Sequence, residues 1–254
     1  MEAETLLTNC LYSSDRKKFD SIERMAKQFS STYVGEFRQI HEHVFDVIRN
    51  YARINKLELD VIRFPSEDPH LWGCFFSASN HDFLFINTRN SLEKQNFAAA
   101  HELYHVLMNE KKYTKKVFSD VVIGNGDIID EDIEANAFSA LLLVPTKALE
   151  DCLDILLVGK TITCKTIQLL NEYFIVPIKT LAMRIYEIGR IDRNALLALL
   201  TTLPKSKVTA IAENVMEFGS LLDNMQYAKD LDLLDDEDIV ADEAFFESLK
   251  PCYW

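Results

Sequence analysis

Two histidines four positions apart, His101 and His105, form the pattern HELYH with Glu102 between them. On a helix this spacing puts both imidazoles on one face, one turn apart, as two ligands of a single tetrahedral zinc ion require. Glu102 then lies beside the metal without binding it. Its carboxylate can take a proton from a water molecule that zinc has acidified, and can later deliver that proton to the leaving amine of a peptide. The spacing is therefore typical of zinc-dependent peptide hydrolysis.

The residues before this pattern predict the helix that it needs. Asn90 and Glu93 resemble a capping box, and Ser91 is an alternative cap. Phe97 is followed by three alanines, which favour a helix and let another element approach closely. The plain alternative is a pair of surface histidines on an amphipathic helix, because HExxH alone also arises by chance. Residues elsewhere in the chain must decide between the two interpretations.

A catalytic zinc site needs a third protein ligand and one open position. The stretch DIIDEDIEANAFSALLLVP predicts a helix over 131–144 with an acidic start. Asp132 and Asn136 are four residues apart, so Asp132 could bind the metal while Asn136 holds the distal nitrogen of a histidine or a backbone carbonyl. Glu131 and Glu134 are alternative ligands on neighbouring faces. Taken alone, each of these carboxylates also fits a solvated helix start that the helix dipole favours.

The combination of HELYH with EDIEANAFSALLLVP resembles the ImmA/IrrE family of zinc metallopeptidases, over about residues 57–190. The family signature joins HExxH to an acidic residue, an Ala-Asn pair, a Phe and a hydrophobic run that ends in Pro. The resemblance implies a gluzincin-like α+β catalytic domain with one zinc ion, held by His101, His105 and Asp132. It also implies that Glu102 is the general base.

Two residues depart from the usual family pattern. Asp132 is shorter than the glutamate of the family, so either Asp132 binds after a small shift of its helix, or Glu131 or Glu134 replaces it. Tyr104 is bulkier than the glycine or alanine usual at its position, and we expect it to pack in the interior or to line the wall of the cleft.

The resemblance further implies a narrow range of protein substrates. Family members typically cleave a helix-turn-helix repressor encoded nearby and thereby derepress stress, phage or mobile-element genes, which points to a bacterial or phage source. The alternative is a non-catalytic regulator that keeps a zinc-stabilised fold and binds a partner, as a toxin, antitoxin or anti-repressor does. An open fourth zinc position would favour the enzyme, because structural zinc sites are closed.

The composition predicts a globular protein of the cytoplasm. Hydrophobic residues make up 48% of the 254 residues, which is enough for a core. No segment has the pattern of a signal peptide or the length of a membrane span, and the five cysteines are scattered without a close pair, so we expect reduced thiols and no membrane partner. The net charge of −13 disfavours direct nucleic-acid binding, since a DNA-binding surface needs lysine and arginine.

The order of the predicted elements suggests four parts. These are a helical lead-in over 1–56, a metallopeptidase core over 57–150, a helix-turn-helix-like subdomain over 151–195, and a helical, acidic segment over 196–254. The apolar spacing predicts helix throughout from Ser14 to Leu57. Within the core, three stretches rich in β-branched and aromatic residues predict a small sheet: Leu57 to Phe64, Trp72 to Ser77 and Phe83 to Thr88. The family resemblance implies that one of these strands is the edge that binds the substrate backbone.

The segment Thr161 to Ile191 predicts two helices joined by a turn near Val176 and Pro177. Its second helix carries only two cations, Lys179 and Arg184, among many apolar residues. A DNA-reading helix needs more polar and basic side chains on its exposed face. We therefore expect this helix pair to support the catalytic domain rather than to read DNA.

Overall fold

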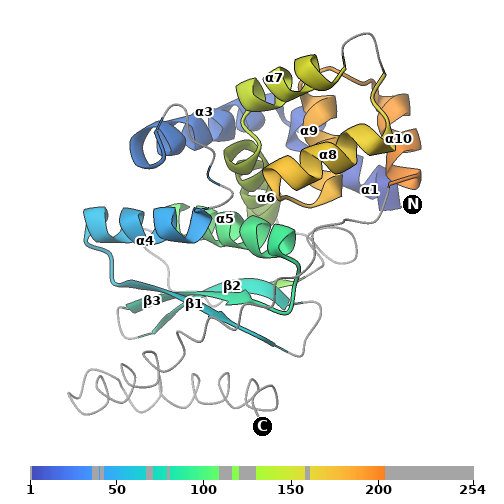
Figure 1. Ribbon diagram of the computed structural model, residues 1–254. Coiled ribbons are helices and arrows are strands. Elements are labelled where there is room, and N and C mark those ends of the chain that lie inside the picture. Colours follow the sequence, from blue (N-terminus) through green and yellow to red (C-terminus); the bar gives the residue numbers. More distant parts are fainter. Residues whose placement is uncertain are drawn as a thin grey trace, which may run out of the picture.

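The computed structural model describes residues 2–35, 40, 43–66, 71–78, 81–108, 116–119, 130–157 and 161–203. Its architecture is α+β, as predicted: a small sheet is covered on one face by two helices, and further helices pack on these on the side away from the sheet (Figure 1). The acidic C-terminal segment beyond residue 203 lies outside the described residues.

The sheet is mixed and has the strand order β1-β3-β2-β4. Its strands are β1 (Leu59–Phe64), β2 (Leu71–Ala78), β3 (His81–Asn87) and β4 (Lys116–Ser119). Strand β1 pairs with β3 in parallel, whereas β3–β2 and β2–β4 are antiparallel. The first three strands coincide with the predicted stretches. The prediction missed β4, because this short strand begins inside the charged run KKYTKK, which lacks the alternation that marks a strand.

The helix that carries the two histidines, α5 (Leu92–Met108), packs on β2 and β3. Its alanines from Ala98 to Ala100 are fully buried. Gly73 of β2 faces this helix, and a Cβ atom at Gly73 would lie 2.9 Å from the carbonyl oxygen of Phe85 and 3.3 Å from the Cβ of Ala98. Small residues on both elements therefore allow the helix to lie close to the sheet.

In the N-terminal region the described residues form helices α1 (Glu2–Thr8), α2 (Leu11–Ser14), α3 (Arg16–Tyr33) and α4 (Val44–Asn55). The prediction of continuous helix from Ser14 to Leu57 was wrong, because Asp15 separates α2 from α3 and because α3 ends at Tyr33. Gly35 has a φ of +96° there, a conformation that glycine adopts readily, and its N–H donates to the carbonyl of Ser30. The break turns the chain so that α4 packs beside β1 and α3 packs on α6.

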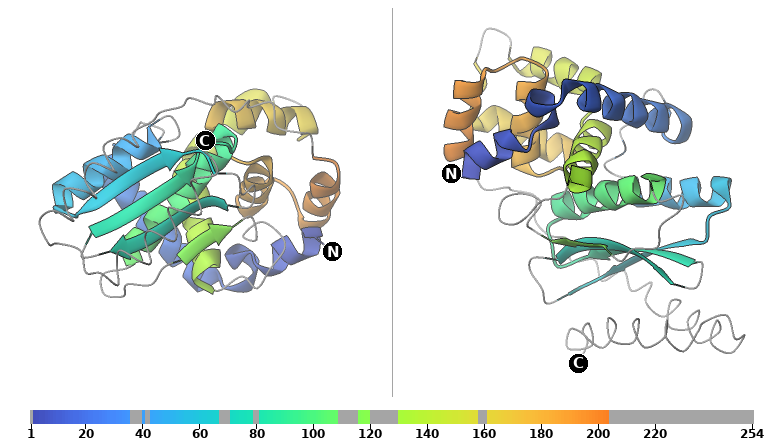
Figure 2. Two further views of the ribbon diagram at one scale, coloured as in Figure 1. Left: turned by 90° about the horizontal axis from the view of Figure 1, so that it is seen from below. Right: turned by 180° about the vertical axis from the view of Figure 1, so that it is seen from behind.

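After the sheet, the described residues form helices α6 (Asp130–Leu143), α7 (Thr146–Leu156), α8 (Cys164–Phe174), α9 (Ile178–Glu187) and α10 (Arg193–Thr201). Helices α8 and α9 are the predicted helix-turn-helix-like pair. Their turn is joined to the start of α5, because Asn171 donates to Glu93 at 2.7 Å and to the carbonyl of Val176 at 2.8 Å. Figure 2 shows from behind that α3 and the helices α7 to α10 lie on the side of α5 that faces away from the sheet.

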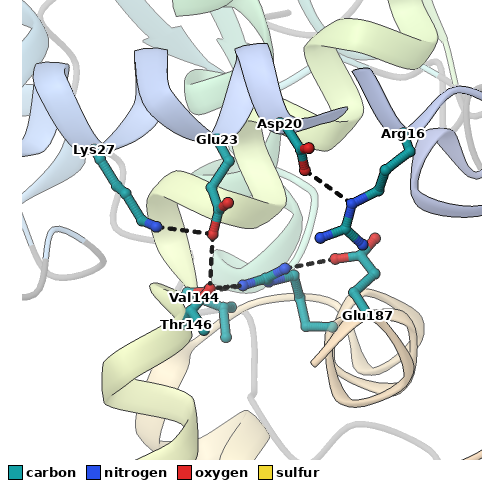
Figure 3. A network of polar contacts seen from close by, with 8 residues as sticks. Arg16, Asp20, Glu23, Lys27, Val144, Thr146 and Glu187 are labelled. Carbon is teal, nitrogen blue, oxygen red and sulfur yellow. Dashed lines mark hydrogen bonds and ion pairs between the residues drawn. The ribbon is translucent and has the colours of Figure 1, made fainter. Parts of the chain in front are cut away.

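A buried polar network fixes α9 to its neighbours (Figure 3). The Arg184 side chain is 1% exposed and donates to the carbonyl of Val144 at 3.2 Å, to Thr146 Oγ1 at 2.9 Å and to Glu187 at 2.6 Å. Thr146 in turn donates to Glu23 of α3 at 3.3 Å. One of the two cations of the second helix is therefore an internal residue, which supports the structural role predicted for this helix pair.

None of the helices within the described residues is both long enough and apolar enough to cross a membrane. Cys10, Cys74, Cys152 and Cys164 carry free thiols, in keeping with the scattered spacing of the cysteines.

Candidate metal centre

Helix α5 begins with a hydrogen bond from the N–H of Gln95 to the carbonyl of Ser91, at 3.0 Å. This geometry fits the alternative cap at Ser91 rather than a capping box of Asn90 and Glu93. Asn90 instead donates to the carbonyl of Leu71, which ties the helix start to β2. The first turn of α5 is thus anchored to the sheet, and the histidines follow two turns later.

His101, His105 and Asp132 come together between α5 and α6. One ligand atom from each side chain lies within 4.8 Å of the other two. The two Nε2 atoms are 3.1 Å apart, and Asp132 Oδ1 lies 3.5 Å from His105 Nε2 and 3.8 Å from His101 Nε2. Both histidines are buried, whereas the Asp132 side chain is 24% exposed. Asp132 is therefore the most exposed of the three side chains.

This donor set fits a tetrahedral zinc ion. Ligand atoms at about 2.0–2.1 Å from such an ion lie about 3.3 Å from one another. The 3.1 Å and 3.5 Å separations bracket that value, and the third, 3.8 Å, is longer than it. Two imidazoles with one carboxylate are ligands that zinc accepts in catalytic sites. The three protein donors would leave a fourth position open.

Each histidine is held from its far side by a residue of α6. His101 Nδ1 lies 3.1 Å from Asn136 Oδ1, and His105 Nδ1 lies 3.0 Å from Glu131 Oε1. Both partners offer an oxygen that can accept a hydrogen bond, which favours the tautomer with the proton on Nδ1 and the lone pair of Nε2 toward the cluster. Metal-binding histidines usually have such partners, which fix the ring and its tautomer.

The electrostatics of the cluster favour the protonation states that bind a metal. Burial lowers the pKa of His101 to about 4, although the nearby carboxylate of Asp132 opposes this change. Burial alone would raise the pKa of the Asp132 carboxyl, but its contacts with His101 and His105 hold that pKa well below the usual range. Near neutral pH the cluster thus combines a neutral imidazole with an ionised carboxylate, which are the forms that coordinate metals.

The other acidic residues of the predicted site have different contacts. Glu131 faces the distal nitrogen of His105, and Glu134 accepts a hydrogen bond of 2.5 Å from Tyr104 and pairs with Lys18 of α3 at 2.6 Å. Asp132 is therefore the α6 carboxylate that lies with the two Nε2 atoms. Burial and the hydrogen bond to Glu134 raise the pKa of the Tyr104 hydroxyl, which stays a donor. Tyr104 is 1% exposed and packs against Phe138, as expected for a packing residue.

Glu102, which lies between the two histidines in the sequence, is fully buried. It directly follows His101 on α5.

Only part of this arrangement could be predicted from the sequence. The spacing of four residues predicted that Asp132 and Asn136 lie on the same side of their helix. The contact of Glu131 with His105 could have been considered from its position next to Asp132 at the start of the helix. The ion pair of Lys18 with Glu134 leaves no signal in either segment, because it joins residues that are far apart in the chain.

Comparison with known protein families gives one match that bears on this centre. The family profile described as IrrE N-terminal-like domain, of the peptidase M78 family, matches residues 54–186, slightly more than half of the chain. A search of curated proteins gave no match. The matched range includes the sheet, the HELYH helix, α6 and the α8–α9 pair. The chain therefore belongs to the ImmA/IrrE family and contains a metallopeptidase-like domain.

Proposed function

We propose that this protein is a zinc-dependent endopeptidase that cleaves a specific intracellular protein, such as a helix-turn-helix transcriptional repressor, and thereby derepresses phage, mobile-element or stress genes. The observation that carries the proposal is the convergence of His101, His105 and Asp132 on the family scaffold. Membership in a peptidase family implies a protein substrate, and the choice of a repressor rests on the family resemblance.

The residues of the centre would divide the work of hydrolysis among them. His101, His105 and Asp132 would hold the metal. Zinc bound there would polarise the scissile carbonyl and lower the pKa of a water molecule. Glu102 would take one proton from the attacking water and pass it to the amine nitrogen as the peptide C–N bond breaks. Asn136 and Glu131 would keep the two imidazoles in the orientation that the metal needs.

A substrate strand could pair only with an edge strand of the sheet. Strands β2 and β3 are interior, so neither can accept a further strand, and the edges of the described sheet are β1 and β4. Helix α5 packs on β2 and β3, and β4 is the outer neighbour of β2. Of the two edges of the described sheet, β1 packs against α4. We therefore propose that the substrate backbone pairs with the outer edge of β4, not with one of the strands recognised in the sequence.

Cleavage in living cells tests this proposal. The chain would be co-produced with helix-turn-helix repressors from its source genome, and the fragments would be identified by mass spectrometry. We expect one repressor to be cut by the unaltered chain, and to stay intact with Glu102→Gln, which loses about 10²–10⁴-fold in rate when a general base is removed. Both proteins should bind equal amounts of zinc. The same fragments from Glu102→Gln would contradict the role of Glu102, and intact repressors in every case would contradict the proposed substrate class.

A further inference from the structure

The side chain of Asp132 has a single methylene group, so its carboxylate can reach the histidines only if the backbone of α6 lies close to α5. Its Oδ1 atom lies 3.5 Å from His105 Nε2 and 3.8 Å from His101 Nε2. These separations depend directly on the distance between the two helices. A contact that fixes this distance therefore also fixes the metal centre.

Such a contact joins three helices beside the cluster. Tyr104 of α5 donates a 2.5 Å hydrogen bond to Glu134 Oε2 of α6, and Lys18 of α3 lies 2.6 Å from Glu134 Oε1. Tyr104 directly precedes His105, and Glu134 follows Asp132 by two residues. Both oxygens of Glu134 are thus engaged at once. A hydroxyl and an ammonium group on one carboxylate give strong, charge-assisted hydrogen bonds.

We propose that Tyr104, Glu134 and Lys18 are positioning residues, which hold α6 at the distance from α5 that the short side chain of Asp132 requires. This inference rests on the metal centre proposed above. It gives helix α3, which lies outside the range that matches the family, a direct part in the geometry of the site. None of the three residues binds the metal or touches the reacting atoms.

The effect of the Tyr104 hydroxyl on the metal centre should depend on the residue at position 132. Removing the Tyr104 hydroxyl frees α6 to move away from α5, and Asp132 then no longer reaches the metal. A glutamate at position 132 is one methylene longer, so it needs a larger distance between the helices. With Glu at this position, the intact contact would hold the helices too close, and its loss would do no harm. The effect of the hydroxyl on zinc affinity should therefore depend on the length of the side chain at position 132.

A double-mutant cycle on the full chain measures this dependence. Tyr104→Phe is made in the unaltered chain and in Asp132→Glu, and the zinc affinity of all four proteins is measured by competition with a chromogenic chelator. We expect Tyr104→Phe to weaken zinc binding about tenfold in the unaltered chain, the scale of losses seen when groups that orient metal ligands are removed. In Asp132→Glu we expect no weakening. Lys18→Met, at a partly exposed position, should show the same dependence with a smaller loss.

Tyr33→Phe is the matched control, because it removes a hydroxyl that contacts Asn55, away from the cluster. It should leave zinc affinity unchanged in both backgrounds, while circular dichroism checks that every variant is folded. Equal losses from Tyr104→Phe in both backgrounds, no loss in either, or no zinc binding by the double variant would overturn the inference. No zinc binding by the unaltered chain would instead contradict the proposed metal centre, so the two failures are distinguishable.

Discussion

The Nε2 atoms of the two histidines face each other and Asp132, whereas their Nδ1 atoms contact different residues of α6. His101 is held by the amide of Asn136 and His105 by the carboxylate of Glu131. A carboxylate increases the basicity of the imidazole that it holds, whereas an amide mainly fixes the ring orientation. The Glu131 side chain is 43% exposed, so water can replace its contact, whereas Asn136 holds His101, which is fully buried. Asn136 should therefore have the clearer effect on metal binding.

Asn136→Ala should weaken zinc binding about 10–100-fold, because the ring of His101 loses the group that fixes its orientation. Chelator competition with the purified protein measures this loss. Asn55→Ala, which removes an exposed amide of α4, is the control and should bind zinc like the unaltered chain. A variant at position 136 with unchanged affinity would show that packing alone orients His101.

At the scale of residues, the sequence predicted both the candidate metal ligands and a residue that holds one of the histidines. The spacing of four between Asp132 and Asn136 indicated that both lie on the same side of one helix, and the structure brings both to the histidines. The choice among Asp132, Glu131 and Glu134 could not be made from the sequence, since all three lie in the first turns of the same helix. Only the packing of α6 on α5 determines which carboxylate turns toward the two Nε2 atoms.

At the scale of elements, the buried arginine of α9 has the largest expected effect on stability. Arg184→Met should lower the free energy of unfolding by about 3–5 kcal/mol, because it leaves the buried carboxylate of Glu187 without its charged partner. Chemical denaturation measures this change. Arg190→Met removes an exposed ion pair with Asp154 and should cost less than about 1 kcal/mol. Similar losses for the two variants would mean that the network contributes no more than a surface ion pair.

The contact of strands β1 and β3 should make stability depend on pH. The hydrogen bond from His81 to Asp60 raises the pKa of His81, while partial burial opposes this change. A folded-state pKa above the unfolded value near 6.5 gives stability that is complete below that value and is lost as the pH rises through the folded pKa. His81→Gln should therefore be less stable than the unaltered chain at pH 5.5 and closer to it at pH 9.

The expected difference for His81→Gln is well under about 1 kcal/mol, since the pair is partly exposed to solvent. Urea unfolding at both pH values would measure the difference, with Asp60→Asn expected to reduce the pH dependence, since Glu58 and Asp82 also raise the pKa of His81. A gap between the variant and the unaltered chain that widens toward pH 9 would have the wrong sign for this account.

The elements themselves were largely predictable from the sequence. Periodic apolar residues and alanines predicted α5, α6, α8 and α9, because such patterns reflect one buried face of a helix. Strand β4 was missed, since it is short and charged. The end of α3 was missed because the apolar spacing continues beyond Gly35, although the structure shows that this glycine takes a positive φ.

At the scale of the whole molecule, the N-terminal helices share one core with the metallopeptidase region. Phe29 of α3 is buried against Phe138 of α6, with ring centroids 6.3 Å apart, and both belong to one hydrophobic cluster. Lys18 and Glu23 of α3 also contact the region that matches the family. The division of the chain at residue 56 remains a prediction, and residues on both sides of it belong to one hydrophobic cluster.

Phe29→Ala and Phe138→Ala should each lower the midpoint of the same single unfolding transition, at a cost of about 3–5 kcal/mol, since each leaves a cavity in a shared core. Calorimetry and circular dichroism would follow the transition. Two separate transitions, with Phe29→Ala affecting only the first, would show that α3 belongs to an independent domain. The packing of α3 on α6 could not be read from the sequence, because apolar periodicity shows which face is buried but not what buries it.

The metal content of the purified chain tests the central claim most directly, with the unaltered protein measured beside Asp132→Ala by elemental mass spectrometry. This account predicts about one zinc ion per unaltered chain, held by His101, His105 and Asp132, and its loss from the variant. No zinc in the unaltered chain, even after reconstitution, or equal zinc in Asp132→Ala would contradict the proposed centre. The first of these results would favour a protein that acts by binding its partner, and the second would move the third ligand to another residue.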